Sequence, residues 1–190
     1  LGGVYTTREL SGGGVLIDWG IHFFDLIFYV LGGVKLETVT CDTYSEMAKD
    51  ISDYKYIGMY AGPAQPDGIN DVEEFVSGYM RTDKASISFN GAWAQNIDHD
   101  EMYIDFLGDK GGARLTYSGT FEFFTTRDGV LQKVEPKYEI PIHYEVESQA
   151  FFEAIRTGER TRAHISNILE SQRVLDILYA SASKREEIRL

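Results

Sequence analysis

Three ionisable side chains interrupt an otherwise apolar segment near the start of the chain. Within residues 15–31, only Asp18, Gly20, His22 and Asp25 are not apolar. Since an α-helix turns by about 100° per residue, Asp18, His22 and Asp25 share one narrow stripe if the segment is helical. Burying a carboxylate without partners is costly, so the pattern predicts that this stripe lines a cleft, a hydrogen-bonded network or a ligand.

General acid/base catalysis is the chemistry that this stripe suits best. Histidine exchanges its proton near neutral pH, and an aspartate one turn earlier can hydrogen-bond the ring, orient it and stabilise its charged form. We therefore predict His22 and Asp18 as the catalytic pair, both in contact with the substrate. Asp25 is expected to be a second orienting group or a partner of a backbone group or an arginine.

Two other interpretations of the stripe stay open at this point. Asp18 and His22 could be a hydrogen-bonded buried pair that only fixes the helix against a sheet. Aspartate and histidine at helical spacing could also bind zinc or iron, but such sites usually need a further converging ligand. No recognisable ligand spacing connects the remaining histidines to the stripe, so we predict no metal site.

Glycines and an arginine precede the apolar segment. Gly12, Gly13 and Gly14 predict an open approach of low bulk to the helix N-terminus, and we expect Gly14 to belong to the substrate-binding residues. Arg8 could meet a substrate hydroxyl or carboxylate, or could be an ordinary surface arginine.

The elements that must position these residues follow from periodicity and turn signals. Apolar residues at helical spacing predict helices at residues 15–31, 144–157 and 167–183, the last with a capping box of Asn167 and Glu170. Alternating or β-branched runs predict strands, and an aromatic-rich element is expected at residues 54–60 within an irregular stretch. The predicted strands are residues 3–7, 35–44, 72–81, 85–95, 101–107, 113–117, 121–126 and 130–134.

The short connections between the later strands leave no room for crossover helices. The predicted fold is therefore α+β, with one largely antiparallel sheet and helices packed on one face. Tyr79, Trp93 and Tyr103 are assigned to the other face, which we expect to be a subunit interface of a homo-oligomer rather than a plain solvated surface.

Composition restricts the partners of the chain. A net charge of −12 with 18 basic residues among 190 argues against nucleic-acid binding. The single cysteine, Cys41, forms no internal disulfide, so a reducing compartment, the cytoplasm, is expected. The charges at Asp18, His22 and Asp25 argue against a membrane span in the one long apolar run.

The order of these motifs resembles one known family. Gly12–Gly14 followed by Asp18-x-Gly20-x-His22-x-x-Asp25 is similar to the signature of the C-terminal domain of the Gfo/Idh/MocA oxidoreductases. Further segments resemble that domain in the same order: residues 71–75, 91–93, 108–115, 152–158 and 171–176.

The resemblance implies a domain organisation and a reaction. Residues 1–190 would be a single C-terminal domain for substrate binding and oligomerisation, following an N-terminal Rossmann domain that binds NAD or NADP and is absent from this chain. His22 would take a proton from a hydroxyl of a sugar, inositol or related polyol while hydride leaves the same carbon for the nicotinamide, and Asp18 would orient that exchange.

This chain also departs from the family pattern. It contains neither a G-x-G-x-x-G fingerprint after a strand nor the Glu-Lys-Pro segment that supplies the family's catalytic lysine, so we expect the fragment alone to be inactive. Two alternatives to the dehydrogenase remain: an NAD-dependent glycoside hydrolase of the same family, and a non-catalytic binding or oligomerisation module.

Overall fold

The computed structural model describes residues 1–47, 49–50, 63–93, 95–97 and 99–190. The chain divides into two compact units, one made of residues 1–96 and 163–190 and the other of residues 97–162. Helices and antiparallel sheets combine as the predicted α+β fold. The aromatic element expected at residues 54–60 lies outside the described residues.

The N-terminal segment is helical rather than extended. A 3₁₀ turn, η1 (Val4–Thr6), and a short helix, α1 (Arg8–Ser11), occupy the region where we predicted a strand at residues 3–7. The hydroxyls of Thr6 and Thr7 both donate to the Gly3 carbonyl, at 3.2 and 3.0 Å. Such local side-chain bonds compete with strand pairing, which explains why the prediction was wrong.

The apolar segment begins with a wide turn before it becomes a regular helix. A π-helical turn, η2 (Leu16–Gly20), leads into α2 (Ile21–Val30), where the pattern predicted one uninterrupted α-helix. Asp18 lies inside this turn and His22 lies beyond it. A π-helix turns by a different angle per residue from the α-helix on which the predicted stripe was based.

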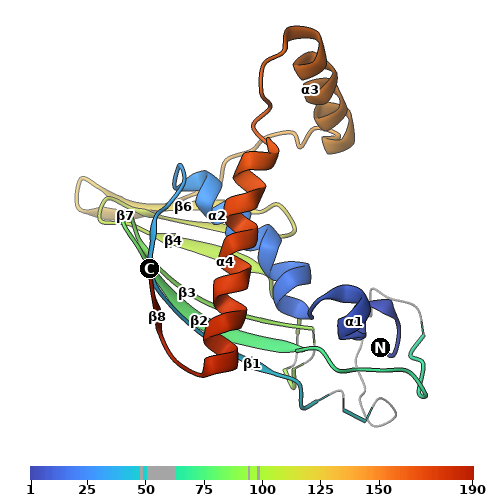
Figure 1. Ribbon diagram of the computed structural model, residues 1–190. Coiled ribbons are helices and arrows are strands. Elements are labelled where there is room, and N and C mark those ends of the chain that lie inside the picture. Colours follow the sequence, from blue (N-terminus) through green and yellow to red (C-terminus); the bar gives the residue numbers. More distant parts are fainter. Residues whose placement is uncertain (48, 51–62, 94, 98) are drawn as a thin grey trace. The chain divides into compact units, whose positions relative to one another are not determined.

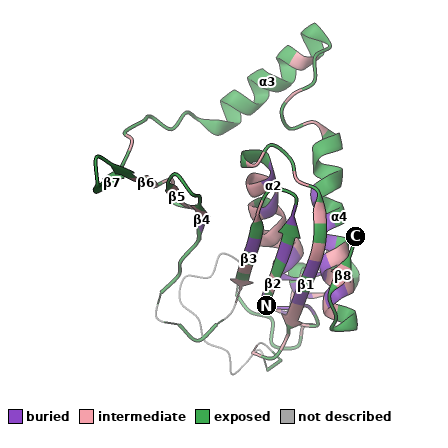
Figure 2. Cartoon of the chain, turned by 90° about the vertical axis from the view of Figure 1, so that its left-hand side faces the viewer, coloured by how far each residue is buried: buried purple, intermediate pink, exposed green. Residues whose placement is uncertain are grey.

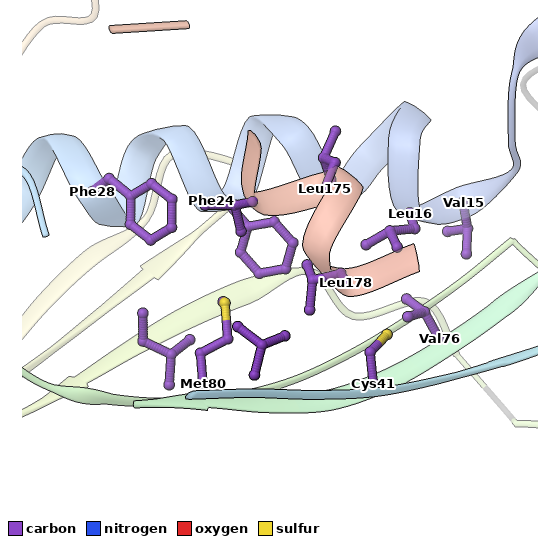
Figure 3. Close-up of a cluster of buried hydrophobic side chains, with 12 residues drawn as sticks. Val15, Leu16, Phe24, Phe28, Cys41, Val76, Met80, Leu175 and Leu178 are labelled. Carbon is purple, nitrogen blue, oxygen red and sulfur yellow. The ribbon is translucent and has the colours of Figure 1, made fainter. Parts of the chain in front are cut away.

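The first unit contains a four-stranded antiparallel sheet in the order β3-β2-β1-β8. Its strands are β1 (Leu36–Tyr44), β2 (Phe75–Thr82), β3 (Ser86–Ala92) and β8 (Ile188–Arg189). Helices α2 and α4 (Ile165–Lys184) lie on one face of this sheet (Figure 1). The two helices and the sheet enclose the core, which includes Leu16, Phe24, Phe28, Met80, Leu175 and Leu178 (Figure 3).

The opposite face of this sheet is polar. Thr40, Tyr79 and Ser88 lie side by side across β1, β2 and β3 and are exposed. Trp93 packs instead against the helix-covered core, and Tyr103 belongs to the second unit. The predicted grouping of Tyr79, Trp93 and Tyr103 on one face is therefore wrong, because Trp93 lies on the helix-covered side and Tyr103 belongs to a different sheet.

The second unit has a sheet of its own, in the order β4-β5-β6-β7. Its strands are β4 (Tyr103–Leu107), β5 (Gly112–Thr116), β6 (Phe121–Arg127) and β7 (Val130–Val134). Residues 95–97 and 99–102 form no strand, so β3 does not continue into β4 through a tight turn, and the chain forms two sheets rather than one.

Both predicted C-terminal helices are present. Helix α3 (His143–Thr157) ends at Gly158 in a left-handed conformation, and nearly all of its side chains are exposed (Figure 2). Helix α4 begins two residues earlier than predicted. Its N-cap is His164, whose ring accepts a hydrogen bond from the Ser166 N–H, so the predicted capping box of Asn167 and Glu170 is wrong.

Residues Arg8–Val30 are long and apolar enough to cross a membrane by length and composition alone. The core helix of a water-soluble protein passes the same test. In this chain the stretch is interrupted at Gly12, which has a φ of 81°, and Phe24 and Phe28 on α2 are buried in the core of the first unit.

Candidate active site

A buried carboxylate, Glu73, holds the backbone where the glycine run joins the π-helical turn. Its Oε1 accepts hydrogen bonds from the N–H of Gly14 at 2.8 Å and of Leu16 at 3.3 Å, and from the hydroxyl of Tyr179 on α4 at 2.6 Å. Its main-chain carbonyl accepts the Val15 N–H at 3.0 Å. Only 3% of the Glu73 side chain is exposed, so water does not compete for these bonds.

The glycines are required by these contacts. A Cβ atom on Gly14 would lie 1.9 Å from the carbonyl oxygen of Glu73, and one on Gly13 would lie 2.2 Å from the hydroxyl of Tyr179. Both residues are buried, so they do not form the open approach that we predicted. Their missing side chains instead let the backbone approach Glu73 and α4 closely.

Asp18 is held from the sheet side of the site. The indole Nε1–H of Trp93, just beyond the end of β3, donates to Asp18 Oδ2 at 3.1 Å. Both side chains are half-buried. Because Trp93 engages one carboxylate oxygen, its hydrogen bond leaves the other oxygen, Oδ1, available to a ligand.

His22 lies in the first turn of α2 and is exposed. Among the described residues it makes no hydrogen bond, so the direct Asp18–His22 bond expected from an α-helical spacing is not formed. A π-helical turn lies between the two residues, where the prediction assumed a regular α-helix. A histidine without a protein partner can instead bond to a substrate hydroxyl.

Asp25 is bound to α4, unlike Asp18 and His22. Its Oδ1 accepts a hydrogen bond from Ser171 Oγ on α4 at 2.9 Å. In the described part of the chain, Asp25 uses none of the three partners that the sequence suggested, and its carboxylate joins α2 to α4. The structure thus brings Asp18 and His22 to one end of the segment and assigns Asp25 to helix packing.

Arg8 is tied to the same buried carboxylate. Its Nη2 lies 3.5 Å from Glu73 Oε2, its Nε–H donates to the Asp71 carbonyl at 3.3 Å, and its main-chain N–H donates to Asp71 Oδ1 at 2.7 Å. Half of the Arg8 side chain is exposed. Arg8 therefore braces α1 against the segment before β2 and still presents part of its guanidinium to solvent.

Tyr179 acts in this network as a hydrogen-bond donor. Burial, and then the Glu73 carboxylate that accepts its hydrogen bond, raise the pKa of Tyr179 well above its ordinary value. The hydroxyl therefore keeps its proton throughout the pH range in which proteins are handled, which suits a structural donor and not a general acid.

Sequence reasoning missed Glu73 and Trp93 as candidate site residues. Glu74 is also buried, and its Oε1 accepts the N–H groups of Glu46 at 2.5 Å and Met47 at 2.7 Å. One sequence signal was available for Glu73: two adjacent glutamates, Glu73 and Glu74, directly precede an apolar strand. Within the described ranges, no three His, Cys, Asp or Glu side chains are grouped as a metal site would require.

The chain matches the model of the Gfo/Idh/MocA family described as "Oxidoreductase family, C-terminal alpha/beta domain", over residues 5–190. It is 35% identical over 115 residues to D-glucoside 3-dehydrogenase of Escherichia coli K12, covering 60% of this chain and 31% of that protein. It is 30% identical over 132 residues to a putative UDP-kanosamine synthase oxidoreductase subunit of Amycolatopsis mediterranei, covering 67% of this chain and 34% of that protein.

Solved structures share the fold at lower identity. An aldose-aldose oxidoreductase from Caulobacter crescentus, complexed with glycerol, superposes with a TM-score of 0.75 at 18% identity, over 99% of this chain and 51% of that one. Levoglucosan dehydrogenase in complex with NADH and levoglucosan gives a TM-score of 0.77 at 16% identity, over 99% and 53%. The chain therefore spans about a third of these curated relatives and about half of these solved proteins.

Proposed function

This chain belongs to the Gfo/Idh/MocA oxidoreductase family as its C-terminal α/β domain, and we propose that the full-length protein oxidises a hydroxyl group of a sugar or related polyol. The observation that carries the proposal is the arrangement of Asp18 and His22. Asp18 is oriented by Trp93, while His22, beyond the π-helical turn, is exposed and makes no bond among the described residues.

In the proposed reaction, an imidazole nitrogen of His22 accepts the proton of the substrate hydroxyl and returns it in the reverse direction. Asp18 Oδ1 accepts a hydrogen bond from the substrate, while the Trp93 indole keeps Oδ2 in place. Arg8 contributes the exposed part of its guanidinium to the substrate site. Gly14, which is buried, contributes to that site indirectly, because its carbonyl accepts the Asp18 N–H at 3.0 Å.

The cofactor of this proposal is NAD or NADP. When bound, it supplies the acceptor for the hydride that leaves the carbon carrying the hydroxyl. The donor set fits this chemistry, since a proton acceptor beside a hydroxyl is what hydride removal requires. The present residues contain no dinucleotide fingerprint, so the groups that hold the cofactor are assigned to the part of the protein outside this chain.

The relatives suggest a substrate class. One is named for D-glucoside oxidation and another for levoglucosan, an anhydro sugar, and the latter is solved with NADH. Several neighbouring hydroxyls are common to these compounds and to inositols, and a site with a carboxylate, an imidazole and a guanidinium suits them. We propose glucosides, related sugars and inositols as the first substrates to test.

Two further proposals concern assembly and location. We propose a homo-oligomer that uses the polar face of the β3-β2-β1-β8 sheet, where Thr40, Tyr79 and Ser88 form one row. Light scattering on the full-length protein and on its Tyr79→Lys variant tests this; an unchanged mass would contradict the proposed face. We also propose a cytoplasmic location, because the single cysteine, Cys41, offers no internal disulfide.

The deciding experiment uses the full-length protein with NAD or NADP and a panel of glucosides, levoglucosan, free sugars and inositols. Reduction of the nicotinamide, followed by its absorbance, with one class of substrate is expected. Release of free sugar without net reduction would instead favour the glycoside hydrolase. If no compound gives either nicotinamide reduction or sugar release, that result would contradict the proposal and favour a binding or oligomerisation module.

A further inference from the structure

The Glu73 carboxylate connects three separate segments of the first unit. Its Oε1 holds the backbone N–H groups of Gly14 and Leu16 and the hydroxyl of Tyr179 on α4, and its Oε2 faces Arg8 on α1. Bonds to an ionised acceptor are stronger than neutral ones, and burial removes competition from water. One side chain therefore sets the mutual position of α1, the glycine run and α4.

A chain of hydrogen bonds leads from this carboxylate to the proposed catalytic aspartate. Glu73 fixes the N–H side of Gly14, and the carbonyl of the same glycine accepts the N–H of Asp18 at 3.0 Å. Leu16, the second backbone donor to Glu73, is the first residue of the π-helical turn that contains Asp18. A shift of Gly14 or Leu16 must therefore move the Asp18 backbone.

We propose that Glu73 is a positioning residue for the Asp18–His22 acid/base site, acting through Gly14 and Leu16 without touching the substrate. This inference rests on the proposed function. Catalytic groups must be held within about 0.5 Å of their productive positions, so a small relaxation of the π-helical turn lowers the rate before it unfolds the protein.

The neighbouring Glu74 offers a matched control. It is as buried as Glu73, with 4% exposure against 2%, and also accepts two backbone N–H groups. Those donors belong to Glu46 and Met47, however, just after β1 and not to the π-helical turn. Replacing each carboxylate by its amide removes the charge at nearly constant volume, so any general cost of altering a buried carboxylate appears in both variants.

The test compares Glu73→Gln and Glu74→Gln in the full-length protein, with the substrate and cofactor found in the panel above. For Glu73→Gln we expect kcat to fall by about 10- to 100-fold with KM changed by less than about 3-fold, and the pH–rate profile to shift, because the proton-transfer geometry is altered. For Glu74→Gln we expect kcat within about 2-fold and an unchanged pH profile.

Backbone hydrogen exchange provides a readout that does not need turnover. The Gly14 and Leu16 amides should exchange faster in Glu73→Gln than in the wild type, and at the wild-type rate in Glu74→Gln. Unchanged exchange at residues 14–16 would overturn the inference. Faster exchange accompanied by a wild-type kcat and pH profile would also overturn it, because the turn would then be mobile without consequence.

The same design separates this inference from the proposed function. If the wild type reduces no nicotinamide with any substrate, the proposed function fails, while exchange at Gly14 and Leu16 still decides whether Glu73 holds the turn. Should Glu73→Gln fail to fold, Tyr179→Phe removes one donor and leaves both backbone bonds. We expect that milder variant to lower kcat by about 2- to 10-fold and to accelerate exchange at residues 14–16; no change in either would contradict the inference.

Discussion

The two units of the chain differ in the carboxylate contacts that join separate elements. In the first unit, three buried or half-buried carboxylates bind partners that are distant in sequence: Glu73 and Tyr179 are 106 residues apart, Asp18 and Trp93 are 75, and Asp25 and Ser171 are 146. In the second unit, the ion pairs are local, with Arg114 nine residues from Asp105 and Arg156 three residues from Glu153.

Burial follows the same division. The Glu73 side chain is 3% exposed, whereas the Arg114 and Asp105 side chains are 36% and 32% exposed. A buried, long-range contact restricts where two segments can lie, while an exposed, local one is screened by water and salt. The contacts that could hold the proposed catalytic residues in fixed positions are therefore those of the first unit.

The largest expected effect concerns the core that supports this accuracy. Leu178→Ala removes a completely buried side chain of α4 and should lower the free energy of unfolding by about 2–5 kcal/mol. Leu107→Ala in β4, where the leucine is 90% exposed, should change it by less than about 0.5 kcal/mol. Chemical denaturation followed by circular dichroism measures both, and similar losses in the two variants would break the comparison.

The next effect concerns the proposed catalytic histidine. His22→Asn should lower kcat by roughly 10²-fold or more, because it removes the proton acceptor without a large change in volume. His143→Asn, at the start of the exposed α3, is the matched control and should leave kcat unchanged. A folded His22→Asn variant with a nearly normal rate would show that the two histidines do not differ in function.

The sequence predicted the elements that local patterns determine. The strand at residues 130–134 agrees with β7 at both ends, and α3 ends at Gly158 as its glycine signal indicates. Hydrophobic periodicity and turn residues carry this information within a few positions of each element.

The site itself depends on information that those patterns do not contain. The contacts of Glu73 with the glycine run, with the π-helical turn at residues 16–20 and with α4 join residues 57 or more positions apart. Even the reason for the glycine run is non-local, because Gly14 is required by the carbonyl of Glu73. Residue type and spacing, together with the family resemblance, predicted Asp18 and His22 as site residues, but only the packed structure identifies Trp93 as the hydrogen-bond partner of Asp18.

A smaller effect on kcat should distinguish the Trp93–Asp18 contact of the first unit from the Tyr103–Arg114 contact of the second. Trp93→Phe keeps a ring but removes the Nε1–H that holds Asp18 Oδ2, so we expect kcat to fall by about 10-fold. In the second unit, the guanidinium of Arg114 lies 4.2 Å from the centre of the Tyr103 ring. Tyr103→Phe retains that ring and should leave kcat unchanged; equal rates for both variants would mean that Trp93 only fills space.

The smallest effect is the pH dependence of the exposed ion pair. The Arg114 guanidinium, bonded to both Asp105 oxygens at 2.7 and 2.6 Å, holds the pKa of Asp105 below its ordinary value. Because the folded pKa lies below the unfolded one, the pair stabilises the protein above about pH 4, and this contribution disappears as the pH falls through the folded value.

Asp105→Asn should therefore lower Tm by no more than about 2 °C at neutral pH, and the difference from the wild type should vanish in acid. It should also vanish in about 1 M salt, because exposed charges are then screened. Glu73→Gln should keep its effect on kcat in the same salt, since ions do not reach a carboxylate that is 3% exposed. If salt weakened the effects of both variants equally, burial would not protect the contacts of Glu73 any better than those of the exposed Asp105–Arg114 pair.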